Sequence, residues 1–425
     1  MRKKVTAMRQ TKRSSKATSR RQFVSGALGA MIAGTASLGF PGTVRAKTTV
    51  RIGLVHPVTG FLAFSGSQCR AGGLMAIEEI NATGGIHSMG GAELEAVLGD
   101  AQSKPDIGAS EVEKMNEVGV AAIVGAYASS IGLATTQRAA RHGIPHVVDV
   151  CVSDAIVERG LQNTFRFGPG YGTVARTAVD NLVKINDAAG RPAKTVMIIH
   201  EDSLFGTGTA RLLSSALPDA SFDLVDVIRH PNPTRDFNNI VLKIRARKPD
   251  IIIPANYYNE YILLARTMSQ YNVRPMAIYS VLGGTASSFK FLKEFPRTAQ
   301  FIMDCNHWYD PGHPAALALR RKAEQRGLYF TYELFLSYCA TKLLADAIER
   351  AGTADREAII EALESSDWSD HFMPYGPTRF VNGQNQGARP LNTQILEGDI
   401  KVIHPAEYAT ADPVFPIPAT VQGNA

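Results

Sequence analysis

The chain has 425 residues, of which 45% are hydrophobic and 20% charged, with 45 basic and 39 acidic side chains. Ten of the basic residues and none of the acidic ones fall within positions 1–46, so the remainder holds 35 basic and 39 acidic residues. No basic stripe is left to bind nucleic acid, and about 379 residues beyond position 46 are too many for one ordinary core, which favours two globular domains.

Residues 1–46 are predicted to be an export signal that takes no part in the fold. A twin-arginine motif, SRRQFV, occupies 19–24, a mildly apolar stretch runs over 24–40, and VRA at 44–46 fits a cleavage site. The apolar stretch is short and interrupted by Gly, Ser and Thr, so a permanent membrane span is not expected. We expect export through the twin-arginine pathway to the periplasm and a mature chain that begins near Lys47.

Beyond residue 46, short apolar runs alternate with helix-like segments. Strands are predicted at 50–55, 94–98, 121–124, 146–150, 195–200, 224–228, 250–254, 276–280 and 301–304. Helices are predicted at 68–82, 111–118, 129–142, 206–217, 235–247 and 258–270. Repeated strand–helix units indicate an α/β fold whose parallel sheets are covered by helices on both faces.

Two extended stretches break this rhythm and are predicted to cross between two lobes. They are FRFGPG at 165–170 and DCNHWYDPGHP at 304–314. Helices at 332–350 and 355–363 would return to the first lobe, and a third crossing near 375–377 would lead to a hairpin that turns through Asn382-Gly383. The predicted lobes are therefore 47–168 plus 305–375, and 169–304 plus 376–425.

Residues 123–154 form a strand–loop–helix–strand–loop unit that predicts a ligand site. In parallel sheets, ligands lie beyond the carboxyl ends of the strands, where the loops 128–130 and 151–154 would meet. Ser129 is predicted to be the N-cap of the intervening helix, so its hydroxyl and the free N–H groups would suit an anion such as a carboxylate. An ordinary capped helix in an α/β core would give the same pattern, and the unit alone favours that interpretation over a ligand site.

The cysteines are scattered and form no C-x-x-C pair, which argues against the usual metal and redox motifs. They are Cys69, Cys151, Cys305 and Cys339. An exported chain could pair them, but a chain of this length buries enough core without a disulfide framework, and we expect none.

Two histidines, His142 and His146, have the spacing of a helical metal pair. Gly143 and Pro145 lie between them and would break the helix, so both histidines are interpreted as structural. We predict neither a metal site nor a cofactor.

The order and spacing of several further pieces carry a family resemblance. The pieces are GLVHPVTG at 53–60, AIEEIN at 76–81 running to GGI at 84–86, DAQS at 100–103 with Pro105, the unit at 123–154, IIHED at 198–202 with Phe205-Gly206, ANYYNE at 255–260 and PYGP at 374–377. Over residues 48–400 the chain resembles the periplasmic binding proteins of ABC importers, and more narrowly the leucine/isoleucine/valine-binding branch.

This resemblance implies a type I periplasmic binding protein fold, that is, two doubly wound parallel-sheet lobes joined by three crossings. A small ligand would be trapped in the cleft between the lobes, and a permease in the cytoplasmic membrane would recognise the closed form. It implies a binding protein without catalysis, and we expect a monomer.

The resemblance also implies which residues contact the ligand. Ser129 matches the position whose hydroxyl and N–H bind the ligand carboxylate, and the loop after the next strand would complete that site. Phe205 and Tyr257 each match an aromatic residue of the second lobe. The full set of expected ligand-binding residues is Phe64, Ser65, Tyr127, Ser129, Cys151, Val152, Ser153, Phe205, Tyr257 and Leu282.

The departures from the family pattern concern the ligand. Relatives that bind amino acids hold the α-ammonium with an acidic residue, which would fall in YSVLGG at 279–284, a stretch without a carboxylate. A buried ammonium without a counter-charge is strongly unfavourable. Asp149, Glu201 or Asp202 could substitute for it. Val152 also lacks the expected hydroxyl, and Ala128 replaces a half-cystine of the family's first-lobe disulfide.

We therefore expect a ligand without an amine, either an aromatic or branched carboxylate or a neutral amide. Two other classes of protein remain as alternatives. A ligand-sensing module of a receptor would use the same fold. An exported enzyme is less compatible, because the sequence has no G-x-G-x-x-G after a strand, no H-E-x-x-H and no G-x-S-x-G.

Overall fold

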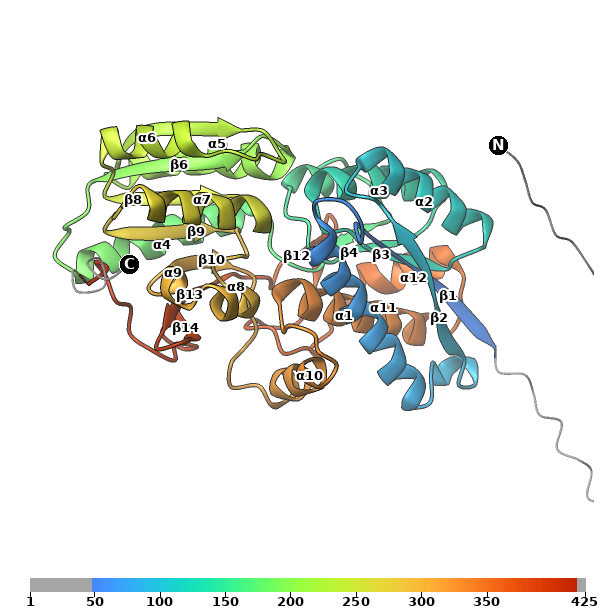
Figure 1. Cartoon of the computed structure of the whole chain (residues 1–425). Helices are drawn as coiled ribbons and strands as arrows, with labels where there is room; N and C mark the ends of the chain where they lie inside the picture. Colours follow the sequence, from blue (N-terminus) through green and yellow to red (C-terminus); the bar gives the residue numbers. More distant parts are fainter. Residues whose placement is uncertain (1–47, 419–425) are drawn as a thin grey trace, which may run out of the picture. The chain divides into compact units, whose positions relative to one another are not determined.

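The computed structural model describes residues 48–418 (Figure 1). The predicted export signal and the expected start of the mature chain at Lys47 therefore lie outside the described residues. Within residues 48–418, no helix is long and apolar enough to cross a bilayer.

The first lobe is built on a seven-stranded sheet with the order β11-β12-β5-β4-β3-β1-β2. Its strands are β1 (Thr49–His56), β2 (Glu93–Asp100), β3 (Ala122–Gly125), β4 (His146–Val148), β5 (Thr164–Arg166), β11 (Phe380–Val381) and β12 (Gln384–Asn385). All pairs are parallel except the β11–β12 hairpin.

Helices cover both faces of this sheet, because alternate residues of its central strands are apolar on opposite sides. Ile52 and Leu54 of β1 join a core with α1 and α11, whereas Val55 joins a separate core with α2 and α3. Gly72 of α1 lies so close to α11 that a Cβ would fall 2.0 Å from the Leu334 carbonyl oxygen, which fixes their close approach. The helices are α1 (Ala63–Ala82), α2 (Pro105–Glu117), α3 (Ser129–Arg141), α10 (Pro314–Gln325), α11 (Tyr332–Ala351) and α12 (Arg356–Glu364).

The second lobe repeats this architecture with a sheet of order β14-β13-β10-β9-β8-β6-β7. Its strands are β6 (Thr195–Glu201), β7 (Asp223–His230), β8 (Ile251–Ala255), β9 (Ala277–Val281), β10 (Met303–Asn306), β13 (Leu391–Leu396) and β14 (Asp399–His404). Strands β6 to β10 are parallel to one another, and β13 and β14 run antiparallel at one edge.

Alternation also explains the helices of the second lobe. Ile198 and Ile253 face the core shared with α4 and α5, whereas Ile199 and Ile252 face the core made with α6 and α7. The helices are α4 (Tyr171–Ala188), α5 (Leu204–Asp219), α6 (Asn238–Arg247), α7 (Tyr258–Gln270), α8 (Phe289–Glu294) and α9 (Pro296–Ala299).

The nine strands predicted from the sequence are confirmed, with ends that shift by one or two residues. The α/β fold with two parallel-dominated sheets is confirmed as well. Three strands went unpredicted, β5, β13 and β14. β13 has the sequence LNTQIL, in which all six residues are buried although three are polar, so no apolar run indicated the strand.

The predicted second-lobe segment 376–425 is wrong for its first ten residues. The hairpin of β11 and β12 does form, and Asn382 and Gly383 adopt the positive φ angles that a two-residue hairpin turn requires. However, Gln384 pairs with Arg166 of β5, so the hairpin extends the first sheet. The third passage between sheets therefore follows the hairpin, and β10 likewise carries the second sheet two residues past the predicted boundary at 304.

Candidate functional site

The loops that follow β3 and β4 lie side by side. The Ala126 carbonyl accepts the backbone N–H of Cys151 at 3.1 Å and its thiol at 2.8 Å. The Ser129 hydroxyl accepts the N–H of Ser153 at 3.3 Å. The two loops that the sequence placed at one sheet edge are therefore joined directly by hydrogen bonds.

Ser129 is not the N-cap of α3, which corrects the sequence prediction. Ala128 holds the extended cap conformation, and Ser129 is the first helical residue. Ala128 offers no side-chain acceptor, so α3 begins without a side-chain cap. Its first N–H groups, together with the buried Ser129 hydroxyl, face the region beyond the strand ends, where an anion would be stabilised.

A small cavity lies between these loops and the second lobe. The first lobe contributes four residues from the loops after β3 and β4 and the start of α3, and the second lobe contributes three. The last residue of β10, the residue after it and the start of α11 supply the rest. The lining residues are Tyr127, Ser129, Val150, Val152, Phe205, Tyr257, Leu282, Asn306, His307 and Tyr332. We call this cavity the cleft.

Aromatic side chains nearly close the cleft. The Tyr257 ring packs against Tyr127 of the first lobe at 5.8 Å between centroids and against Phe205 at 5.2 Å. The remaining space is about 20 Å³, room for about one water molecule. A larger ligand enters only when Tyr257 and Tyr127 separate, which is the motion that hinged closure of two lobes provides.

The loop after β9 forms the second-lobe wall. Leu282 has a left-handed backbone (φ 59°), and its N–H donates to the Cys305 carbonyl at 2.9 Å. Gly284 also has a positive φ, and a Cβ there would lie 2.4 Å from the Tyr332 ring. The apolar side chain of Leu282 therefore lines the cleft within the stretch 279–284, where an acidic residue was expected.

The comparisons with known proteins agree with this geometry. A family model described as periplasmic binding protein matches residues 49–398. This chain belongs to that family.

Among its relatives is the Leu/Ile/Val-binding protein homolog 7 of Brucella abortus, 26% identical over 383 residues that cover 87% of this chain and 95% of that protein. Two solved structures share the fold. The leucine binding protein LivK from Thermotoga maritima superposes with a TM-score of 0.71 at 22% identity, covering 83% of this chain and 97% of that one. LivJ from Streptococcus pneumoniae in complex with isoleucine gives 0.72 at 20% identity, covering 87% and 100%.

Six of the ten expected ligand-binding residues line the cleft of this periplasmic binding protein. They are Tyr127, Ser129, Val152, Phe205, Tyr257 and Leu282. The other four do not reach its lining. Phe64 packs outside it on Tyr258, at 4.9 Å between ring centroids, and Ser65, Cys151 and Ser153 are buried behind the lining.

Four lining residues went unpredicted, Val150, Asn306, His307 and Tyr332. Asn306 and His307 belong to the stretch at 304–314 that was interpreted only as a crossing. Two adjacent polar residues at the carboxyl end of a buried strand were the available signal. Tyr332 donates a hydrogen bond to the Tyr127 hydroxyl at 3.2 Å, a contact between segments 205 residues apart.

None of the three carboxylates considered as substitutes lines the cleft. Asp149 accepts hydrogen bonds from the Val150 N–H at 2.9 Å and from His56 Nε2 at 2.7 Å, and both side chains are fully buried. Glu201 accepts from two N–H groups and two side chains around the start of α5. Asp202 is exposed and accepts from the Asn232 N–H. Each of the three carboxylates accepts hydrogen bonds from other residues of the chain.

The core below the loops holds a buried polar cluster. One ligating atom each from His56, Cys69 and Asp149 lies within 4.8 Å of the others. His56 and Asp149 bond each other directly, and burial raises the pKa of the Cys69 thiol well above its usual value. The neighbouring His146 is buried too, which lowers its pKa to about 4. The contact between His56 and Asp149 explains the arrangement without an ion.

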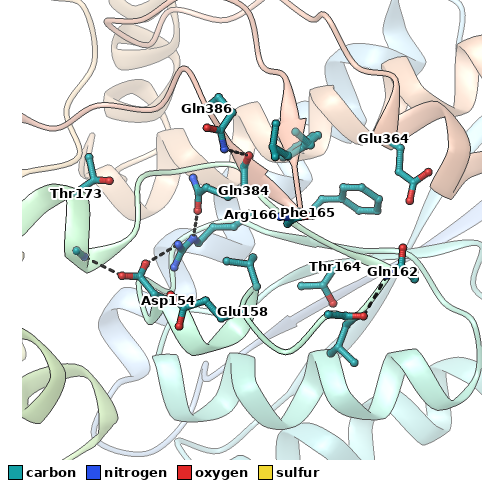
Figure 2. A pocket seen from close by; sticks show the side chains of 18 of the residues that line it. Asp154, Glu158, Gln162, Thr164, Phe165, Arg166, Thr173, Glu364, Gln384 and Gln386 are labelled. Atoms are coloured by element: carbon teal, nitrogen blue, oxygen red, sulfur yellow. Dashed lines mark hydrogen bonds and ion pairs between the residues drawn. The ribbon is translucent and has the colours of Figure 1, made fainter.

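A second, larger concavity of about 830 Å³ lies beside the first crossing (Figure 2). We call it the crossing groove; among its lining residues are Asp154, Glu158, Arg166, Thr173, Gln384 and Gln386. Arg166 donates to the Asp154 carboxylate at 2.7 Å and to the Gln384 side chain at 2.6 Å. It also donates to the carbonyls of Val152 and Ser153 at 2.8 Å each. The groove's central cation is therefore satisfied by the chain.

Proposed function

We propose that this protein is the extracytoplasmic solute-binding subunit of an ABC importer and that it traps a small carboxylate or amide without an amine. Support for the transport role comes from family membership and from relatives named for leucine, isoleucine and valine binding. A similar structure from Silicibacter pomeroyi is named a putative branched-chain amino acid ABC transporter. A permease in the cytoplasmic membrane would then be the partner of the closed form.

The composition of the cleft carries the proposal about the ligand. Its first-lobe end offers the Ser129 hydroxyl and the N-terminus of α3, which favour an anionic group. None of its lining residues is a carboxylate. An ammonium in this place would lose its hydration without gaining a counter-charge, whereas a carboxylate or amide would keep its hydrogen bonds.

The aromatic walls favour an apolar ligand body. Tyr127, Phe205 and Tyr257 line the cleft, and Val150, Val152 and Leu282 add aliphatic surface. Burial of a branched or aromatic side chain against them would supply the non-directional part of the affinity. A ligand with little apolar surface, such as urea, would gain little from this cleft.

Paired calorimetric titrations test the ligand proposal. Leucine is compared with 4-methylpentanoate, and phenylalanine with 3-phenylpropanoate, so that each pair differs only in the amine. We expect the amine-free member to bind more tightly and to raise the melting temperature more at equal concentration. Tighter binding of either amino acid than of its partner acid contradicts the proposal.

We further propose export through the twin-arginine pathway, which the motif at 19–24 supports. Changing Arg20 and Arg21 to lysine should retain the precursor in the cytoplasm, whereas the same change at Arg9 and Arg13 should leave export intact. Fractionation of cells that express each variant measures this. Normal periplasmic yield of the Arg20/Arg21 variant contradicts the assignment of the pathway.

A further inference from the structure

His307 is a polar residue in the wall of the cleft that lacks a polar partner. Its side chain is 1% exposed, and neither ring nitrogen has a hydrogen-bond partner among the described residues. The side chains of Asn306 and Tyr332, which also line the cleft, form hydrogen bonds with other groups. Asn306 accepts the His307 N–H at 2.8 Å and donates to Asp304 at 3.2 Å, and Tyr332 donates to Tyr127.

The position of the imidazole ring is fixed on two sides. It stacks on Tyr332 with centroids 6.1 Å apart and ring planes 22° apart. On another side it approaches Gly168 of the first crossing so closely that a Cβ there would lie 3.0 Å from its Cε1. The ring of this second-crossing residue is thus held between Gly168 of the first crossing and Tyr332 of α11, and it lines the cleft.

A buried imidazole without hydrogen bonds is costly, and native structures seldom leave one. The cleft is the space that His307 lines, so a ligand there is the natural partner. Burial lowers the pKa of His307 to about 3, and the positive charge of Arg166 adds to this effect. The ring is therefore neutral at physiological pH, with one donor and one acceptor nitrogen.

These features indicate the kind of group that His307 recognises. A hydroxyl or amide can both donate to and accept from a neutral imidazole. An ammonium would find only the acceptor, and the nearby Arg166 charge would oppose it. We propose that His307 is a ligand-binding residue and that the ligand carries a neutral hydroxyl or amide group in addition to its carboxylate. This inference rests on the proposed function and names its ligand class more narrowly.

Binding of two pairs of acids to the wild type and to His307→Phe tests the inference. One pair is 2-hydroxy-4-methylpentanoate and 4-methylpentanoate, and the other is 4-hydroxybenzoate and benzoate. We expect the wild type to prefer the hydroxylated member of at least one pair by about tenfold. Phenylalanine keeps the ring against Tyr332 and removes both nitrogens, so the preference should fall below about threefold while the plain acid keeps its affinity.

Two further variants make the result decisive. His87→Phe changes an exposed histidine and should preserve the preference. If His307→Phe does not fold, His307→Asn replaces it, and its shorter side chain should also reduce the preference. The inference is overturned if the variant at position 307 keeps the preference for the hydroxylated acid, including the case in which only its melting temperature falls. An ordered water would then be the partner of the imidazole.

The outcomes separate this inference from the function on which it rests. If the plain acids bind in a manner that requires Ser129 and the hydroxyl preference is absent in the wild type, the inference fails and the proposed function stands. If the wild type binds none of the four acids, both fail.

Discussion

The cleft and the crossing groove contrast in size and in the state of their polar groups. The groove offers about 830 Å³ and the cleft about 20 Å³. Yet Arg166 in the groove makes hydrogen bonds to four groups of the chain, whereas the ring of His307 in the cleft makes none with any residue in 48–418. Figure 2 shows the groove network, in which Arg166 lies between Asp154 and Gln384.

This difference teaches that volume alone does not locate the ligand site. A polar network that satisfies itself stabilises a fold, and a ligand has little to add to it. A buried polar group without a partner that lines a cavity, such as His307, can gain a hydrogen bond from a ligand there. The two regions are also connected, because Arg166 holds the carbonyls of Val152 and Ser153, in the loop that borders the cleft.

The largest expected effect is on stability, from the groove side of the comparison. Arg166→Met should lower the free energy of unfolding by about 3–5 kcal/mol, because it removes all four hydrogen bonds of a buried guanidinium and leaves Asp154 and the two carbonyls with one backbone N–H partner each. Urea denaturation measures this, with Gln386→Ala as a control at the exposed edge of the groove. A loss below about 1 kcal/mol would mean that the network is not structural.

The second prediction concerns acid and the cleft. The pKa of His307 is about 3 in the folded chain and about 6.5 when unfolded, so the unfolded state binds the proton first. The stability that depends on a neutral His307 is fully present above pH 6.5 and is lost as the pH falls toward 3. Between pH 6.5 and pH 4 this amounts to about 3 kcal/mol. Urea denaturation at each pH measures the free energy of unfolding, which should fall by about 3 kcal/mol more for the wild type than for His307→Phe between pH 6.5 and pH 4. Parallel pH profiles of the two proteins would contradict this prediction.

A third, smaller effect is expected on affinity. Ser129→Ala should weaken binding of 4-methylpentanoate by about 1–3 kcal/mol, the usual contribution of a hydrogen bond to a charged group. Ala128 is the N-cap, so no cap is lost, but the Ser129 hydroxyl also accepts the Ser153 N–H, and the empty protein should lose about 1 kcal/mol of stability. Calorimetry and thermal melting measure the two quantities, with Ser130→Ala as the matched control. Unchanged affinity would exclude Ser129 from the anion site.

The smallest effect is expected from the aromatic wall. Tyr257→Leu removes the ring contacts with Tyr127 and Phe205 and should weaken binding of 3-phenylpropanoate by about 0.5–1.5 kcal/mol. Tyr258→Leu is the control, because Tyr258 packs on Phe64 outside the cleft. Equal losses in both variants would show that the contribution is not specific to the cleft wall.

The sequence by itself determined the architecture. Buried parallel strands are continuous apolar runs such as Ile251–Ala255, and the helices between them are amphipathic, so their alternation predicted an α/β fold. It also located Ser129 and the loop at 151–154, since the carboxyl ends of neighbouring parallel strands lie at one sheet edge. These are local patterns whose spatial consequence is general.

Only the tertiary structure decided which residues from distant segments meet. The hairpin at 380–385 joined the first sheet because Gln384 pairs with Arg166, 218 residues away, a preference that no local pattern encodes. The structure also showed that Ser129 is the first helical residue and not the cap, because Ala128 holds the extended conformation. His307 became a candidate ligand residue through the absence of any partner, which is visible only when all of its neighbours are placed.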